Sequence, residues 1–388
     1  MKIAFSHDWL SFYSGGDKTL EAMLEHYPDA PVYTLIYQAE NFRDTHIAQH
    51  PIHTSFIEKL PKGRTKYRSY LAFMPLAIEQ FDLSEYDVVV SSSSAIAKGV
   101  ITGPNQLHIS YIHTPIRYAW DLQHQYLREA NMETGIKSWL ARWVLNKIRI
   151  WDIRTINGVD KMVANSHYIA RRIRKVYGRN ATVIYPPVDI DAFPLYEQKQ
   201  DFFLTASRIV PYKKINLIVK AFNKMPEKRL VVIGDGTEFK KLKAIAGSNI
   251  ELMGYQPDEV LKDKMQKARA FVFAAEEDFG ITPVEAQSCG TPVIAFGKGG
   301  ATETVKDGET GLFFSEQTEE SIIEAVQRFE QQVFIPKKIH EHAKYFSKAR
   351  FQNEMISLIE TSWEKRLMEH KKTHQIIPLT DSSTFQHS

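Results

Sequence analysis

Short β-rich runs alternate with amphipathic helical patterns along the whole chain. In the first half, each run is followed by a loop rich in Gly, Ser or Pro. This alternation is typical of parallel sheets whose strands are joined by crossover helices. The runs that predict strands cover residues 2–6, 88–91, 109–112, 161–164 and 182–185 in the first half, and residues 202–205, 229–233, 250–253, 270–274, 292–295 and 311–313 in the second.

The length of the chain and two interruptions of this pattern indicate two domains. A chain of 388 residues is too long for one ordinary core and fits two domains of roughly 150 to 200 residues. Pro186-Pro187 and the polar run over residues 194–201 break the alternation, and residues 337–370 are helical in pattern again. The expected units are a domain over residues 1–193, a second over 194–345, a helix over 346–375 that crosses back to the first domain, and a flexible tail over 376–388.

The expected architecture determines where function should concentrate. The fold class is α/β, with two Rossmann-like, doubly wound domains facing a central cleft. Doubly wound sheets bind ligands in the loops at the carboxyl ends of their strands, and here these loops face the shared cleft. We therefore look for functional residues directly after the predicted strands.

The composition is that of an ordinary globular chain and argues against several classes of function. Hydrophobic residues make up 43% and charged residues 24%, which disfavours disorder. A formal charge of +3 is too small to indicate nucleic-acid binding. The single cysteine, Cys289, permits no intramolecular disulfide and fits a reducing compartment. Since the start has no apolar leader and no stretch reaches about 18 apolar residues, we expect a cytoplasmic protein that meets a membrane only from the surface.

Two stretches of the first half combine basic and aromatic side chains. Residues 59–75, KLPKGRTKYRSYLAFMP, carry five Lys or Arg and no acid, and residues 136–154, IKSWLARWVLNKIRIWDIR, are basic and rich in Trp. An anionic membrane surface attracts such segments by about 1 kcal/mol for each cation. The alternative is that their Trp and Leu side chains pack inside while the Lys and Arg side chains are solvated. We expect peripheral association with an anionic membrane.

A carboxylate pair with a fixed spacing stands out in the second half. Residues 271–300, FVFAAEEDFGITPVEAQSCGTPVIAFGKGG, place Glu277 in the loop after a strand and Glu285 one turn inside the following helix. Gly280 allows a close approach of the backbone to a ligand, and the first amides of the helix form an anion site. One carboxylate can accept hydrogen bonds from a sugar and the other from a ribose. Solvated acids at a helix N-terminus are the alternative.

Two cations precede this segment in another strand-to-helix loop. Arg208 and Lys213 lie in the run ASRIVPYKKINLIVKAF, after a strand and before a helix. A nucleoside diphosphate leaves a reaction as an anion, and two cations at this point can neutralise it without a metal. No acidic metal cluster is visible in the sequence. Lys214 is interpreted as a solvated neighbour.

Other loops fit a ligand site less specifically. Gly15 and Gly16 lie between the first strand and a helix, where a dinucleotide fold presents amides to phosphate, although such a pair is more often only a turn. His113 follows a buried strand, a place where histidine is more often structural than catalytic. Ser166 follows another strand.

These motifs resemble those of one enzyme family. Residues 271–300 are similar to the EX7E signature of glycosyltransferase family 4, a retaining family with the GT-B fold. The run HTP-x-RYAWD, residues 113–121, looks like a subgroup that includes bacterial O-antigen and exopolysaccharide mannosyltransferases. After Gly16 the family usually has a small residue and Glu, whereas this chain has Asp17-Lys18. The departure leaves a phosphate role for Gly16 open and puts any family role of the next side chain in doubt.

The resemblance implies a role for each candidate residue. The catalytic set it implies is His113 at the donor sugar, Arg208 and Lys213 at the diphosphate, and Glu277 at the sugar hydroxyls. The donor-binding set it implies is Glu285 at the ribose, the amides of Phe279, Gly280 and Ile281 at the sugar and diphosphate, Gly15, Gly16 and Ser166 near the phosphate or acceptor, and Gly254 with Tyr255 over the base.

The resemblance also implies the reaction. We expect a metal-independent retaining hexosyltransferase without a cofactor, in which the first domain binds the acceptor and the second the nucleotide sugar. Mannose from GDP-mannose is the expected donor, and a lipid-linked saccharide of bacterial surface polysaccharide the expected acceptor. A UDP-sugar donor, a sugar-nucleotide epimerase of the same fold and a non-catalytic nucleotide-sugar binding protein remain as alternatives. Nucleic acid is not an expected partner.

Overall fold

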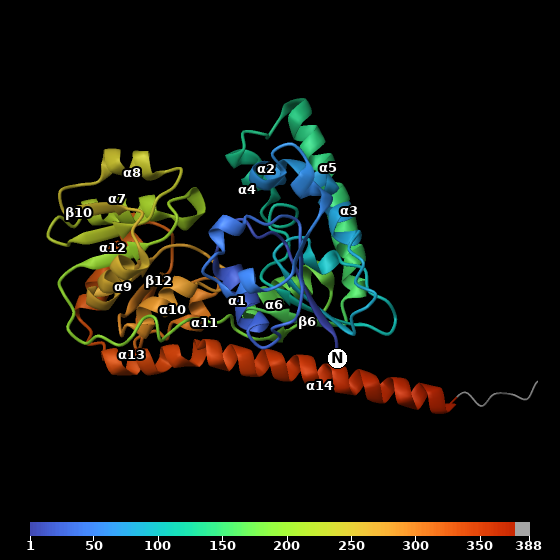
Figure 1. Cartoon of the computed structure of the whole chain (residues 1–388). Helices are drawn as coiled ribbons and strands as arrows, with labels where there is room; N and C mark the ends of the chain where they lie inside the picture. Colours follow the sequence, from blue (N-terminus) through green and yellow to red (C-terminus); the bar gives the residue numbers. More distant parts are fainter. Residues whose placement is uncertain (377–388) are drawn as a thin grey trace, which may run out of the picture.

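Two α/β domains lie side by side, and two consecutive helices run along their base, α13 (Pro336–Ala343) beneath the second domain and α14 (Lys348–Ile376) beneath the first (Figure 1). The computed structural model describes residues 1–376, with side chains to residue 371. The tail predicted over residues 376–388 lies outside the described residues, except for Ile376 at the end of the last helix. Both sheets are built from parallel strand pairs. The predicted α/β class with two doubly wound domains is therefore confirmed.

The first domain is built on a sheet of seven described strands in the order β3-β2-β1-β4-β5-β6-β7. Its central strands are buried along their whole length because helices cover both faces. The strands are β1 Ile3–His7, β2 Val32–Thr34, β3 Ile52–Thr54, β4 Val88–Ser93, β5 Leu107–Ile112, β6 Lys161–Ala164 and β7 Thr182–Val183.

The second domain is built on a sheet of six described strands in the order β10-β9-β8-β11-β12-β13. Every one of these strands overlaps a predicted one, since short apolar runs such as LVVI and AFVF are buried in full. The strands are β8 Phe203–Ala206, β9 Leu230–Ile233, β10 Ile250–Gly254, β11 Ala270–Phe273, β12 Val293–Phe296 and β13 Gly311–Phe314.

Helices connect the strands and cover the sheets. The α-helices of the first domain are α1 Gly15–Leu24, α2 Gly63–Lys66, α3 Met74–Glu79, α4 Gln123–Glu129, α5 Gly135–Thr155 and α6 His167–Tyr177. The later ones are α7 Ile215–Asn223, α8 Phe239–Ile245, α9 Asp258–Lys267, α10 Ile281–Ser288, α11 Ala301–Thr304, α12 Glu319–Glu330, α13 Pro336–Ala343 and α14 Lys348–Ile376. The short 3-10 helices are η1 Ala39–Asn41, η2 His46–Gln49, η3 Phe56–Lys59, η4 Tyr67–Phe73, η5 Ala97–Gly99, η6 Ile156–Gly158, η7 Pro211–Lys213 and η8 Lys344–Phe346.

The sequence pattern misses two strands and one break in a helix. β2 and β3 have three residues each, and β3 is only partly buried, so neither produces a long apolar run. The helical pattern over residues 337–370 is interrupted after Ala343. The break has a physical reason, because the backbone of Phe346 and Lys348 on either side of Ser347 bonds to Val188 at 3.0 and 3.1 Å instead of continuing a helix.

The last helix, α14, belongs to the core of the first domain. Its side chains Phe351, Met355 and Ile359 are fully buried in the same cluster as Leu20 of α1 and Tyr111 of β5. The chain therefore passes between the domains twice, once after β7 and once before α14.

The topology brings the loops that carry the candidate residues to one region. Strand order reverses between β1 and β4 in the first sheet and between β8 and β11 in the second. Loops leave the carboxyl ends of these neighbouring strands side by side. Gly15 follows β1, Lys213 follows β8 and Glu277 follows β11.

Candidate active site

The loop of Glu277 packs against two glycines in the segment after β12. A Cβ on Gly300 would lie 2.3 Å from Cα of Phe279, and one on Gly299, whose φ is +72°, would lie 2.5 Å from the carbonyl oxygen of Glu277. The amide of Gly300 donates a 2.7 Å hydrogen bond to the same carbonyl. Only glycine permits this approach of two backbones. The backbone of the Glu277 loop therefore packs directly on the neighbouring loop of the same domain.

Lys213 is paired with Glu277, and Arg208 lies further out. The Lys213 ammonium forms an ion pair with the Glu277 carboxylate, and both side chains are mostly buried. Lys213 stands at the end of η7, above the ring of Tyr212. Arg208 is exposed and donates a 3.0 Å hydrogen bond to the hydroxyl of Tyr212. The two predicted cations thus occupy one loop, but only Lys213 contacts a predicted carboxylate.

Glu285 lies at an opening between the domains. A cleft of about 580 Å³ is lined from the first domain by the segment of Gly15 and Lys18 and from the second by α9 and the start of α10. Glu285 is 7% exposed, and the ammonium of Lys18 lies 3.7 Å from its carboxylate across the cleft. Burial raises the pKa of Glu285 above its ordinary value, and Lys18 opposes this shift. A buried carboxylate facing a cation can accept hydrogen bonds from a polar ligand.

The start of α10 approaches the first domain closely. Gly280 precedes the helix with φ +89°, a conformation that favours glycine, and leads directly into Ile281. A Cβ on Gly15 would lie only 2.7 Å from Cδ1 of Ile281. Phe279 is buried beside Val188. The predicted residues Phe279, Gly280 and Ile281 therefore stand where the two domains meet.

His113 lies beneath the glycine turn of the first domain. Its Nε2 atom is 2.8 Å from Oγ of Ser92, and a Cβ on Gly16 would lie 3.7 Å from the same nitrogen. Burial, with the nearby His7, lowers the pKa of His113 to about 3. The imidazole is therefore neutral near pH 7 and suited to hydrogen bonding with a neutral ligand. His7 itself pairs with Asp17 at 3.2 Å.

Ser166 joins the two domains, whereas Gly254 and Tyr255 lie at the end of β10, an edge strand of the second sheet. Oγ of Ser166 accepts from the amide of Ile169 at 3.1 Å, as a helix cap, and donates to the carbonyl of Asp278 at 2.6 Å. Gly254 has φ +70°, and Tyr255 is 78% exposed. Neither lines the cleft at Glu285, and the same holds for the proposed catalytic residues Arg208, Lys213, Glu277 and His113.

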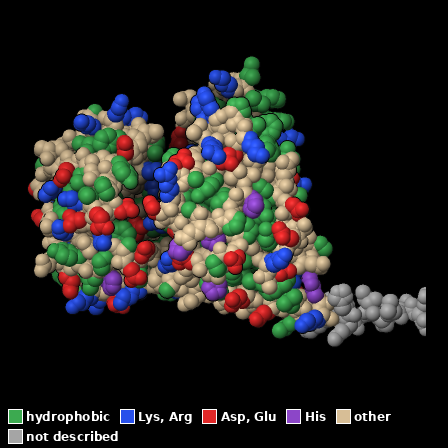
Figure 2. All heavy atoms as spheres, viewed as in Figure 1, with side chains coloured by type: hydrophobic (Ala, Val, Ile, Leu, Met, Phe, Trp, Pro, Cys, Tyr) green, Lys and Arg blue, Asp and Glu red, His purple; other side chains and the backbone are tan. Residues whose placement is uncertain are grey.

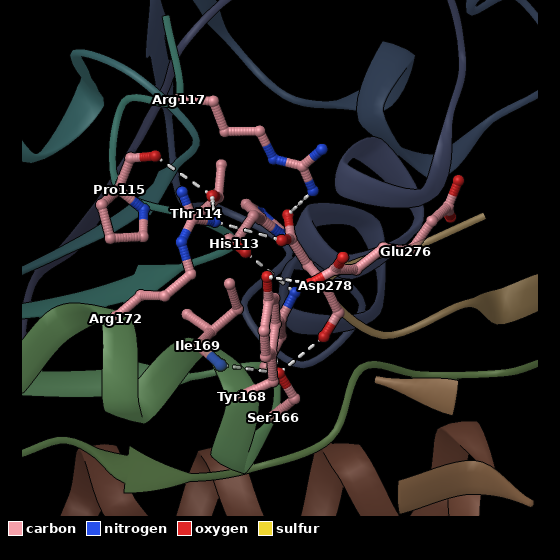
Figure 3. Close-up of polar contacts among 12 residues, drawn as sticks. His113, Thr114, Pro115, Arg117, Ser166, Tyr168, Ile169, Arg172, Glu276 and Asp278 are labelled. Atoms are coloured by element: carbon pink, nitrogen blue, oxygen red, sulfur yellow. Dashed lines mark hydrogen bonds and ion pairs between the residues drawn. The ribbon is translucent and has the colours of Figure 1, made fainter. Parts of the chain in front are cut away.

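Four charged residues of this region were not predicted as site residues, and two of them, both arginines, contact a third, an aspartate. Arg117 and Arg172 of the first domain both form ion pairs with Asp278 of the second (Figure 3). Lys18 is the fourth. Arg117 lies in the HTP-x-RYAWD run, which was a signal, but Arg172 and Asp278 become recognisable only when the domains are placed together. The Asp278 carboxylate, against the effect of burial, raises the pKa of Arg117 above its ordinary value.

Neither a cluster of metal-binding side chains nor a membrane-spanning helix is present among the described residues. Within residues 1–371, no group of three or more His, Cys, Asp or Glu side chains is arranged to hold a metal ion. In the same part of the chain, no helix has the length and apolar character needed to cross a membrane.

Comparison with known proteins finds similar chains. An uncharacterized glycosyltransferase of Methanocaldococcus jannaschii is 29% identical over 222 residues, which are 56% of this chain and 59% of that protein. A D-inositol 3-phosphate glycosyltransferase of a Mycobacterium strain is 27% identical over 183 residues, 41% of this chain and 42% of that one. The chain thus matches about half the length of these relatives. The solved structure of HepE from Anabaena in complex with UDP has a TM-score of 0.67 at 18% identity and covers 93% of this chain and 100% of that one.

Two family models match the chain. Residues 14–192 match the model described as Glycosyltransferase Family 4, and residues 189–350 match the model described as Glycosyl transferases group 1. The models meet at the boundary between the two sheets, in the order that a GT-B fold requires. We conclude that the chain belongs to the family 4 glycosyltransferases of GT-B fold.

Proposed function

We propose that the protein is a retaining, metal-independent hexosyltransferase that uses a nucleoside diphosphate sugar as donor. Mannose from GDP-mannose is the first candidate, and a lipid-linked saccharide of bacterial surface polysaccharide is the proposed acceptor. The observation that carries the proposal is the cleft between the domains, where Glu285 and the start of α10 face Gly15 and Lys18. Figure 2 shows the groove between the two lobes.

In this proposal, each candidate residue binds a different part of the donor. Glu285 accepts hydrogen bonds from the ribose, and Glu277 accepts them from the sugar hydroxyls. Lys213, which is paired with Glu277, also binds the diphosphate, and Arg208, bonded to Tyr212, binds it from the outer side. His113 is neutral and contacts a sugar hydroxyl. Positioning and electrostatic stabilisation then account for catalysis.

Retention is explained by substitution on one face of the sugar. The bond between the anomeric carbon and the β-phosphate oxygen breaks, the acceptor oxygen bonds to the same face, and the departing phosphate takes the acceptor proton. A double displacement would need an enzyme carboxylate beneath the anomeric carbon, and none of the candidate residues is assigned that role. Trapping of a covalent glycosyl-enzyme would contradict this mechanism.

The donor nucleotide is the least constrained part of the proposal. HepE was solved with UDP-glucose as well as with UDP, which supports a UDP-hexose as the second candidate. A sugar-nucleotide epimerase, unlike a transferase, would convert the donor without an acceptor. A non-catalytic binding protein would bind the donor but convert none of it.

A donor panel tests the proposal. Purified protein is titrated calorimetrically with GDP-, UDP- and ADP-sugars in the presence of EDTA, and donor hydrolysis is followed in parallel. We expect one donor to bind and to be slowly hydrolysed despite the chelator, and Glu285→Ala to lose binding or turnover. Glu316→Ala, an exposed glutamate of the same domain, is the control and should behave as wild type. If no nucleotide sugar binds, the proposed function is wrong.

We also propose that the first domain attaches to an anionic membrane, on the cytoplasmic side of the cell. At the start of α5, Trp139 and Trp143 are 68% and 49% exposed, with Ile136 and Leu140 beside them. Basic side chains of this helix, among them Lys137 and Lys147, are exposed as well. Figure 2 shows hydrophobic and basic side chains together at the tip of this lobe. Apolar insertion and attraction to anionic lipid act together on such a surface.

Vesicle flotation tests the attachment. We expect the protein to float with vesicles containing anionic phosphatidylglycerol at low salt and not with phosphatidylcholine vesicles. The double variant Trp139→Ala, Trp143→Ala should lose this binding, whereas Val333→Ala, an exposed apolar residue of the other domain, should keep it. Absence of flotation by the wild type on anionic vesicles would contradict the proposal.

A further inference from the structure

Two arginines of the first domain meet one carboxylate of the second. Arg117 contacts one oxygen of Asp278, and Nη1 of Arg172 lies 3.3 Å from the other. All three side chains are at most 23% exposed. Asp278 follows Glu277 directly, so the charge contacted by the first domain is attached to the loop that carries the carboxylate proposed to bind the sugar.

The first domain holds this loop at neighbouring points as well. The Ser166 hydroxyl donates to the carbonyl of Asp278 at 2.6 Å, and the hydroxyl of Tyr168 donates to Glu276 at 3.1 Å (Figure 3). In the other direction, the carboxylate of Glu303 accepts from the amides of His167 and Tyr168, each at 2.7 Å. The N-terminus of α6 is therefore joined to the second domain by side chains from both partners.

Arg172 also forms hydrogen bonds within the first domain. Its Nη1 donates to Oγ1 of Thr114 at 2.7 Å, and its Nη2 donates to Asp121 at 2.6 Å. Thr114 follows His113 directly, so the same guanidinium contacts the segment of the proposed sugar-binding histidine and the loop of Glu277. A guanidinium with several donors in a fixed plane suits this connection, and a lysine ammonium does not.

We propose that Arg117, Arg172 and Asp278 form an interdomain latch that places Glu277 for catalysis only when the domains are closed. The inference rests on the proposed function, because Glu277 is assigned there to the donor sugar. When the domains separate, water solvates all three charges; when they close, Asp278 is buried and needs both arginines as partners. Closure and the position of the Glu277 loop are thereby coupled. The three residues are positioning residues, since none of them is proposed to touch the reacting atoms.

The test distinguishes an effect on the position of Glu277 from an effect on donor binding. Asp278→Asn is predicted to lower kcat by about 10- to 100-fold, the range expected for a misplaced catalytic group, while the Kd of the free nucleotide stays within about twofold of wild type. Small-angle X-ray scattering of the variant, measured with and without donor, should show a larger radius of gyration than that of the wild type in the same state. Asp201→Asn, which removes the Asp201–Arg269 ion pair outside the domain interface, is the matched control and should change neither quantity.

Double variants test whether the arginines act through the carboxylate. Adding Arg117→Met or Arg172→Met to Asp278→Asn should not lower kcat below that of Asp278→Asn alone. As single variants, Arg172→Lys should keep a higher kcat than Arg172→Met but a lower one than wild type. Additive losses, or a kcat of Asp278→Asn equal to wild type, would overturn the latch and leave the proposed function intact. If the wild type neither binds nor turns over a nucleotide sugar, the proposed function is wrong. The latch is then tested only by the difference in radius of gyration between Asp278→Asn and wild type without donor, and equal radii would overturn it.

Discussion

Burial lowers the pKa of two histidines of the first domain, His108 and His113. Nδ1 of His108 is 3.0 Å from the carbonyl oxygen of Gly158, and its Nε2 is 2.8 Å from the hydroxyl of Ser91. Burial lowers the pKa of His108 to about 4, as it lowers the pKa of His113 to about 3. Both imidazoles stay neutral in the folded protein at a pH where unfolded histidine takes up a proton.

Stability should therefore fall as the pH drops from about 6.5 towards 4. In this range the unfolded chain binds more protons than the folded one, so each histidine removes up to about 1.4 kcal/mol of unfolding free energy per pH unit. We predict that His108→Gln unfolds in urea with a flatter dependence on pH than wild type, even if it is less stable at pH 7. His26→Gln, at an exposed histidine of the same domain, is the control. Equal slopes for His108→Gln and wild type between pH 7 and 5 would contradict the prediction.

Single residues of the site were predictable where one segment contains the whole signal. Glu277 and Glu285 have a fixed spacing, and Lys213 follows a strand, so their neighbourhood follows from the sequence. Lys18, Arg172 and Asp278 were missed because their partners lie on the other domain. Nothing in a local pattern shows which face of one domain will meet a residue of the other.

At the level of elements, the loop pair after β11 and β12 is held by backbone packing. A Cβ on Gly300 meets the backbone of Phe279 and the carbonyl of Asp278, neither of which can move as a side chain would. We predict that Gly300→Ala displaces the Glu277 loop, costs about 1–3 kcal/mol of stability and lowers kcat more strongly than it weakens nucleotide binding. Thermal unfolding and steady-state kinetics measure the two effects. Gly158→Ala, at a glycine that like Gly300 has no positive φ but lies in open space, is the control for the change from glycine to alanine itself. If the two variants have the same kcat, the packing argument is wrong.

The strands of the second sheet were predictable for a simple reason. Except for the edge strand β10, each is a run of four mostly apolar residues that is almost fully buried, and a strand buried on both faces leaves just such a run in the sequence. β2 and β3 were not predictable, because three residues with Tyr or His among them give no pattern. The break before α14 was hidden since its cause is a contact with Val188, more than 150 residues earlier in the sequence.

At the scale of the molecule, the last helix contributes to the stability of the first domain. Phe351 is fully buried against Tyr111, with ring centres 5.7 Å apart. We predict that Phe351→Ala costs about 3–5 kcal/mol and that calorimetry assigns the loss to the transition of the first domain, so that a nucleotide bound to the second domain does not restore it. Leu367→Ala, at a more exposed position of the same helix, should have little effect. A loss confined to the transition of the second domain would contradict this placement of α14.

The two passages of the chain between the domains are joined to each other. Val188, on the first passage, exchanges two backbone hydrogen bonds with the residues on either side of Ser347, on the second. Two linked connections restrict the relative motion of the domains to rotation about an axis near this bridge, unlike a single flexible linker. Opening of the latch at Asp278 is therefore expected to be a hinge motion.

The position of α14 also has a consequence for how the protein is made. Phe351, Met355 and Ile359 complete a core whose other members come from residues 3–184, so that core stays incomplete until the last part of the chain has been synthesised. At roughly 5–20 residues per second, the ribosome needs on the order of ten to thirty seconds to add the intervening second domain. During that time the nascent first domain exposes the apolar surface that α14 will cover. The domain that is synthesised first is thus the one whose folding is finished last.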